Sequence, residues 1–208
     1  TGSITFPSES PVTNKLESYE FTTGTAGNYT VTTADGELTM KNASAAITIT
    51  AASQTWTYDG KAHTNSEVTV TNGELLPGDE LVATATGSAT NVVDTRDGNN
   101  PIAEGYKIMH GDEDVTANYV ITPVAGTLTI NPKAVTVTAQ DKEFTYTGEA
   151  QSWPKYDVDG LVGDDAIEAV VTGSITFPSE SPVDNVVASY EFTTGTPGNY
   201  SVTTANGQ

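Results

Sequence analysis

Apolar and polar residues alternate with a period of two in many short runs of this chain. Ile47 and Ile49 alternate with threonines, and Val135 and Val137 do the same. Successive side chains of a strand face opposite sides of a sheet, so this pattern predicts strands with one buried and one wet face. Turn signals such as Asp59-Gly60 fall between the runs. With no sustained apolar stripe of 3.6-residue period, the pattern predicts an all-β chain.

Short strands and frequent turns are typical of a small two-sheet β-sandwich of the immunoglobulin-like kind. A β-grasp module with one small helix is the alternative, and the best helix candidates are residues 14–19, 164–169 and 185–190. Aromatic side chains are expected to anchor the cores, because a ring buries far more area than Thr or Ala. These anchors are Trp56, Tyr58, Tyr119, Phe144, Tyr146 and Tyr200.

The chain repeats itself at two levels, which is the strongest feature of its sequence. Residues 1–37 and 172–208 are identical at 29 of 37 positions without a gap, at an offset of 171. A weaker repeat relates residues 46–62 to residues 134–150 at an offset of 88. Each unit opens with an alternating strand and an aromatic-Thr-Tyr-x-Gly turn. It then passes a Gly-Asp turn and closes with an Asn-Tyr pair and a Gly-x-Leu-Thr strand.

These repeats predict three parts in the chain. The N-terminal segment (residues 1–41) corresponds to the C-terminal half of a preceding module. Module one (45–131) is a complete β module, and module two (134–208) is a second β module that lacks its last strand. The connections are short, with Pro132 between modules one and two, so consecutive modules are expected to be held closely rather than joined by a flexible linker.

Charge and composition exclude several classes of function. The chain has 8 Lys and Arg against 27 Asp and Glu, a net charge of −19, which argues against binding nucleic acid or an anionic membrane. The absence of cysteine removes disulfides, thiolate metal sites and cysteine nucleophiles. No apolar run is long enough for a transmembrane helix, and a secretion signal is expected outside these residues.

The order and spacing of several motifs resemble a known family. They are the Tyr58-Asp59-Gly60 triplet, Phe144-Thr-Tyr-Thr-Gly148, Gly160-Leu-Val-Gly-Asp164, Gly198-Asn-Tyr200 and Gly126-Thr-Leu-Thr-Ile-Asn-Pro132. Together they are similar to the MBG/YDG-type tandem repeat modules of large bacterial cell-surface proteins. The resemblance covers essentially the whole chain, although Thr147 stands where module one has Asp59. It implies an exported, adhesin-like surface protein whose modules form a stalk, and it implies no catalytic residues.

Two acidic clusters are candidate calcium sites, because calcium takes six to eight oxygen ligands. One cluster comprises Asp157, Asp159, Asp164 and Asp165, and the other comprises Asp112, Glu113 and Asp114. The first cluster lacks the spacing and the terminal Glu of an EF-hand loop, and it is not matched in module one. We interpret both clusters as solvated turns on an acidic surface.

Candidate covalent and catalytic groups are few. Lys61 and Lys107 are candidates for a Lys–Asn isopeptide crosslink, but Glu149 replaces Lys61 in module two, and exposed lysines are the favoured interpretation. His63 and His110 occur only in module one and are interpreted as surface or turn residues. We therefore expect no enzyme activity, no catalytic, cofactor-binding or metal-binding residues, and no cofactor.

The leading hypothesis is a structural stalk or spacer repeat of an extracellular bacterial surface adhesin or fibre. Its expected partners are neighbouring modules or chains of the same protein, with no nucleic acid and no membrane insertion. One alternative is a ligand-binding adhesin module that recognises a host protein or a glycan through residues 153–156 (Trp-Pro-Lys-Tyr), although a packed strand entry is the favoured interpretation of Trp153.

The other alternative is a strand-swapped, head-to-tail filament subunit. The N-terminal segment is expected to pair with module one, with a neighbouring chain or with the open edge of module two, for example by donating residues 37–40. Three Asn-x-Thr/Ser sequences, at Asn28, Asn42 and Asn199, resemble glycosylation sites. We interpret Asn28 and Asn199 as turn formers.

Overall fold

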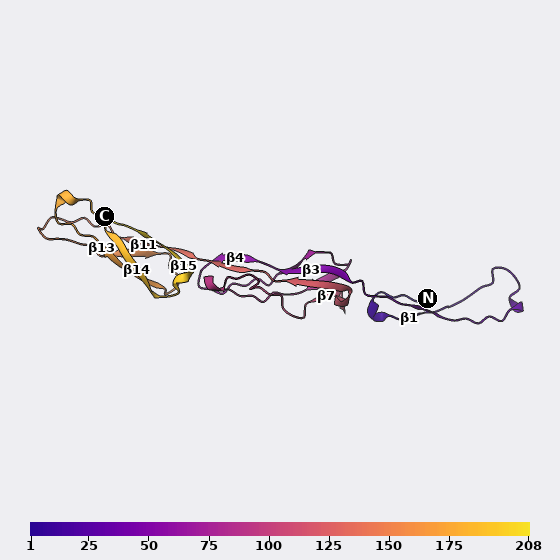
Figure 1. The fold of residues 1–208 in the computed structure, drawn as a ribbon. Helices are drawn as coiled ribbons and strands as arrows, with labels where there is room; N and C mark the ends of the chain where they lie inside the picture. Colours follow the sequence, from indigo (N-terminus) through magenta and orange to yellow (C-terminus); the bar gives the residue numbers. More distant parts are fainter. The chain divides into compact units, whose positions relative to one another are not determined.

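The computed structural model describes all 208 residues and consists of strands, short 3₁₀-helices and turns (Figure 1). It contains no α-helix, so the all-β prediction is confirmed. None of its helical segments has the length and apolar character needed to cross a membrane. The chain divides into two compact units, one of residues 1–50, 69–83 and 104–123 and one of residues 51–68, 84–103 and 124–208.

The elements follow one another in a regular order along the chain. The strands are β1 (Val12–Asn14), β2 (Gly36–Leu38), β3 (Ala45–Ala51), β4 (Gln54–Thr57), β5 (Val68–Asn72), β6 (Asp79–Val82), β7 (Lys107–His110), β8 (Glu113–Asp114), β9 (Tyr119–Val124), β10 (Leu128–Asn131), β11 (Lys133–Ala139), β12 (Tyr156–Asp159), β13 (Ala166–Thr172), β14 (Val186–Thr194) and β15 (Tyr200–Ala205). The 3₁₀-helices are η1 (Pro7–Glu9), η2 (Ala26–Asn28), η3 (Val92–Asp94), η4 (Thr116–Asn118), η5 (Pro178–Glu180) and η6 (Pro197–Asn199).

The first unit holds three small sheets. Strands β5, β3 and β9 form one sheet, and β6, β7 and β8 form a second, antiparallel sheet. In β3 the aliphatic side chains of Ile47 and Ile49 are buried, as the alternating pattern predicts. The N-terminal segment contributes the third sheet, in which β2 pairs with β1 in antiparallel register, Leu38 opposite Val12. Both strands belong to the N-terminal segment, so this segment pairs with itself. The three predicted strand partners were module one, a neighbouring chain and the open edge of module two, and this pairing is with none of them.

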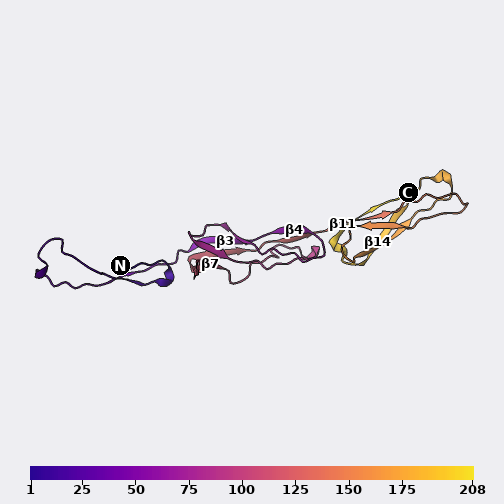
Figure 2. The same cartoon turned by 180° about the vertical axis from the view of Figure 1, so that it is seen from behind.

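The second unit combines parallel and antiparallel pairs. Strand β10 runs parallel to β4, and β15 runs parallel to β11, whose other edge pairs with β12 in antiparallel register. Strands β13 and β14 form a separate antiparallel pair. In both ribbon views β11 and β14 lie side by side (Figures 1 and 2). Their buried side chains share one core with those of β10 and β13, including Leu128, Val135, Val137, Ile167 and Val187.

The predicted short helices are wrong. Residues 185–190 lie almost entirely in β14, residues 166–169 begin β13, and Asn14 ends β1. The physical reason is visible in β14, where the β-branched pair Val186 and Val187 sits opposite Thr172 and Val171 of β13. Branching at Cβ favours extended backbone, and cross-strand packing outweighs a weak local helical pattern.

The predicted aromatic anchors are confirmed at Tyr58, Tyr119 and Tyr200, which are buried. Tyr146 is an exception, since its exposed fraction is 56% against 9% for Tyr58, its counterpart at the offset of 88. Tyr58 directly follows β4, which is paired with β10, whereas residues 142–147 form no strand. Tyr146 is therefore exposed because no strand covers this part of module two.

Candidate functional site

The carboxylates of the first acidic cluster do not come together at one site. Asp157 accepts a hydrogen bond from Gln140 Nε2 at 2.9 Å, and Asp165 accepts one from the Tyr200 hydroxyl. Asp159 lies on β12 opposite Thr136 of β11. No group of three or more His, Asp or Glu side chains is arranged to hold a metal ion.

The second acidic cluster forms polar contacts within the first unit. Asp114 Oδ2 pairs with Lys107 Nζ at 3.0 Å, and Asp114 Oδ1 accepts from the Thr116 hydroxyl at 2.6 Å. The Thr116 hydroxyl, followed by Lys107, lowers the pKa of the Asp114 carboxyl to about 2. Glu113 accepts a hydrogen bond from Ser8 Oγ of the N-terminal segment at 2.7 Å. These contacts stabilise a local turn and a contact between segments.

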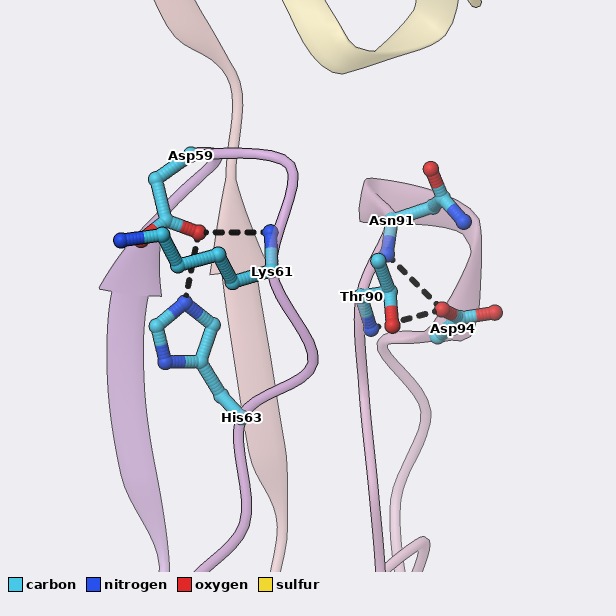
Figure 3. Close-up of polar contacts among 6 residues, drawn as sticks. All are labelled: Asp59, Lys61, His63, Thr90, Asn91 and Asp94. Carbon is cyan, nitrogen blue, oxygen red and sulfur yellow. Dashed lines mark hydrogen bonds and ion pairs between the residues drawn. The ribbon is translucent and has the colours of Figure 1, made fainter.

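The Tyr-Asp-Gly turn of module one is closed by Asp59 (Figure 3). Its Oδ1 accepts from the main-chain N–H of Lys61 at 2.9 Å and lies 2.9 Å from His63 Nε2. Those hydrogen bonds, from Lys61 first and then His63, lower the pKa of Asp59. The His63 ring also stacks on Trp56 at a centroid distance of 4.8 Å. The Lys61 side chain is exposed, and it is the main-chain amide that contacts Asp59.

The partly exposed His110 side chain contacts a polar group around Asp79, whose own side chain is buried. The His110 Nδ1 atom lies 2.7 Å from Asp79 Oδ1, and Asp79 Oδ2 accepts from the Tyr119 hydroxyl. That hydroxyl in turn accepts from Leu76 N at 2.8 Å. The Phe6 ring of the N-terminal segment meets the His110 ring edge-on at 5.3 Å. His110 thus packs where the N-terminal segment contacts module one.

The Tyr–Asp pair recurs in module two without a histidine. The Tyr200 hydroxyl donates to Asp165 Oδ2 and accepts from Val162 N at 3.2 Å. Burial, and then the Asp165 carboxylate, raise the pKa of Tyr200, and the same two causes raise the pKa of Tyr119 beside Asp79. The Gly-Asp turn and the Asn-Tyr pair, separate in the sequence, therefore meet in each module.

A buried asparagine bridges separate chain segments in each module. Asn100 Oδ1 accepts from Gly87 N at 2.9 Å, and its Nδ2 donates to Ala52 O at 2.8 Å and Asn65 O at 2.9 Å. In module two, Asn185 Nδ2 donates to the carbonyl oxygens of Gln140 and Trp153, at 2.9 and 2.8 Å. Both asparagines also exchange main-chain hydrogen bonds with a glycine, Gly126 or Gly207.

Glycine is required at Gly126 because the main chain approaches so closely there. A Cβ atom on Gly126 would lie 2.2 Å from Ala52 O, and one on Gly207 would lie 2.5 Å from Ala139 O. Both distances are below any normal carbon–oxygen contact, so only glycine allows the asparagine bridge to close.

A second recurrent feature is a 3₁₀ turn closed by an acidic side chain. In module one, Asp94 Oδ2 accepts from the main-chain N–H groups of Thr90 and Asn91 at 2.9 and 2.8 Å (Figure 3). Glu180 does the same in module two, as does Glu9 in the N-terminal segment. Main-chain donors lower the pKa of all three carboxyls, because they stabilise the charged form.

The η3 turn is part of the contact between the two modules in the second unit. Val92 N donates to Asn199 Oδ1 at 2.9 Å, and Asn199 Nδ2 donates to Asn91 Oδ1 at 2.7 Å. Beside them, the Tyr58 ring meets the Tyr200 ring edge-on at 5.3 Å. A single core cluster contains residues of both modules. Asn199 is buried, so its amide holds this contact together rather than facing solvent.

The remaining predicted site residues are spread over the fold. Trp153 is partly buried, its Nε1 donates to Gln140 Oε1 at 3.2 Å, and Lys142 Nζ lies 4.9 Å from its ring centroid. Asn28 ends the exposed turn η2, and Asn42 is exposed. Hence the sequence-predicted candidates do not come together in one place.

Sequence reasoning missed the asparagine bridge and the carboxylate-closed turns. The only signal for them in the sequence is that the same residue types recur in both modules. Asn100 and Asn185, for example, lie near the same position of the weaker repeat. Comparisons of the chain with family models, with curated proteins and with solved structures found no match.

Proposed function

We propose that this chain is a spacer segment of an extracellular bacterial surface protein, built from tandem MBG/YDG-type modules and without catalytic activity. The observation that carries the proposal is the contact between modules one and two. One apolar cluster includes Leu128 and Ile130 before Pro132 and Val135 and Val137 after it. A joint packed in this way resists bending, which a spacer needs and a flexible linker lacks.

The finer architecture proposed for each module is a small β-sandwich. In module two the buried residues of β11 (Val135, Val137) share a core with those of β13 and β14 (Ile167, Val187). Two small sheets that pack through their apolar faces favour a sandwich over the β-grasp alternative, which needs a helix.

The surface charge supports the same role. A net charge of −19 on 208 residues opposes collapse and self-association of neighbouring copies. The near-identical segments at an offset of 171 suit a protein whose copy number sets its length.

A length series tests the spacer role. Chains with one, two and three copies of the 171-residue period should show a maximum dimension in small-angle scattering that rises by a constant increment per period. Each added period repeats the same packed joints, which is why the increment is constant. A dimension that grows only as the cube root of chain length, as in a single compact globule, would contradict the proposal.

A further inference from the structure

Two joints connect the parts of this chain, and each is made by one of the carboxylate-closed 3₁₀ turns. We call this turn, with the residue before it, the exit turn; it is η1 in the N-terminal segment, η3 in module one and η5 in module two. The residues that an exit turn contacts in the next module are the entry face of that module. Between modules one and two, η3 contacts an entry face around Asn199. Between the N-terminal segment and module one, η1 contacts an entry face of His110 and Glu113.

The exit turns share one backbone conformation but differ in sequence. The residue before the turn is extended, with φ and ψ of −109° and 159° at Asn91 and of −117° and 143° at Phe177. The turn then begins with Val92 in module one and with Pro178 in module two, and the N-terminal segment has the same residues as module two here. An extended residue is what a following proline favours. The backbone of the exit turn therefore accepts either valine or proline at its first position.

The joint between modules one and two uses the one main-chain group that proline lacks. Val92 N donates to Asn199 Oδ1 at 2.9 Å, and Asn199 Nδ2 donates to Asn91 Oδ1 at 2.7 Å. Asn199 is only 1% exposed, so water does not reach its amide to replace a missing partner. A proline in place of Val92 would leave a buried acceptor unpaired, which is costly.

The joint between the N-terminal segment and module one is built from side chains of the exit turn instead. The Phe6 ring meets the His110 ring edge-on at 5.3 Å. Ser8 Oγ donates to Glu113 Oε1 at 2.7 Å. Neither contact uses the main-chain N–H at the first position of the turn, so proline is compatible with both.

The asparagine of the entry face also has a different donor at this joint. Asn118 stands before Tyr119 as Asn199 stands before Tyr200, and Asn118 Oδ1 lies 3.4 Å from Ala43 N. Ala43 belongs to the segment that leads into module one. The entry face of module one therefore needs no N–H group from the exit turn.

We propose that the entry face of module two selects between exit turns: it binds the Asn-Val turn of module one and excludes the Phe-Pro turn of a second module two. In the excluded pair both polar atoms of the Asn199 amide lose their partners, because Phe replaces Asn91 and Pro replaces Val92. Specificity of this kind comes from an unpaired polar group in the wrong complex. Modules one and two therefore alternate, which makes the exact repeat 171 residues long rather than 88. The selectivity concerns which faces associate, so it can fail while the spacer role stands.

A double-mutant cycle in the full 208-residue chain isolates the contact. Val92→Pro should raise the equilibrium constant for unfolding of module two about 5- to 100-fold above that of Val92→Ala, which retains the N–H donor. Hydrogen exchange in β11 and β15 under urea measures this constant. In the Asn199→Ala background no acceptor is left unpaired, so the two variants should agree within about 2-fold. A proline effect of equal size in both backgrounds would locate the damage in the turn itself, and it would overturn the proposal, as would the absence of any effect.

An exchange of exit turns tests the selectivity directly. Asn91→Phe with Val92→Pro gives module one the first two residues of the module-two turn. Spin labels at Thr55→Cys on β4 and Glu168→Cys on β13 should then show a broad distance distribution, where the unexchanged chain shows a narrow one. Pro7→Val in η1, which belongs to the other joint, is the matched control and should leave the distribution narrow. A narrow distribution after the exchange would overturn the selectivity and would leave the packed joint of the spacer intact.

Discussion

Replacing Tyr200 by alanine is expected to lower the free energy of unfolding of module two by about 3–5 kcal/mol, the usual cost of truncating a buried aromatic side chain. The ring stacks on Phe192 at 5.3 Å and meets Tyr58 edge-on at the same distance. The truncation also deprives Asp165 and Val162 N of their hydroxyl partner. Urea unfolding, followed by hydrogen exchange in β11 and β15, measures the loss.

The control for this variant is Tyr190→Ala, whose ring is 42% exposed on the neighbouring strand β14. It should cost about 1 kcal/mol or less, as surface substitutions usually do. Equal losses from the two variants would mean that Tyr200 is not the anchor of the joint.

The conservative variant Tyr200→Phe adds a dependence on pH to the same prediction. The pKa of Tyr200 is raised in the folded chain, above its unfolded value of about 10. The hydroxyl therefore contributes its full stabilisation below pH 10 and loses it as pH rises through the folded pKa. The stability difference between wild type and Tyr200→Phe should therefore be constant below about pH 10 and shrink as the pH rises above that value. A constant difference would contradict the role of the hydroxyl.

Replacing Asn100 by alanine is expected to destabilise module one by about 3–5 kcal/mol, because three buried main-chain groups lose their partner. Those groups are Gly87 N, Ala52 O and Asn65 O, and no solvent reaches the Asn100 side chain, which is 0% exposed. Asn42→Ala, at an exposed position, is the matched control and should have almost no effect. The difference in urea midpoint between the two variants is the measurement.

Asn100→Asp distinguishes lost hydrogen bonds from lost volume. The aspartate retains the acceptor for Gly87 N but places a carboxylate oxygen against two carbonyl oxygens. At neutral pH it should be at least as destabilising as alanine, since a buried charge without a donor is costly. An Asp variant as stable as wild type would show that the Nδ2 bonds contribute little.

Local sequence patterns were enough to predict the strands and several core residues. The alternation of apolar and polar residues predicted β3 and β11, because a strand that buries one face has this period. The aromatic positions predicted the buried residues Tyr58, Tyr119 and Tyr200. Residues 185–190 were misread as helical, since their strand character comes from pairing with β13 rather than from local pattern.

Long-range contacts could not be predicted in the same way. The parallel pairing of β4 with β10 joins residues more than 70 positions apart, and the sequence of neither strand indicates which strand it pairs with. Asparagine is usually read as a turn former, so the bridges at Asn100 and Asn185 left no signal beyond their recurrence.

The central claim is that modules one and two share a packed joint, and a distance measurement across that joint tests it most directly. The chain has no cysteine, so two introduced cysteines give unique spin-label sites. Thr55→Cys on β4 and Glu168→Cys on β13 lie on either side of the joint, and Lys155→Cys with Glu168→Cys provides a reference pair inside module two. The account predicts one distance distribution for the first pair, as narrow as that of the reference pair and broadened by Asn199→Ala. A broad distribution in the unmodified joint would contradict it.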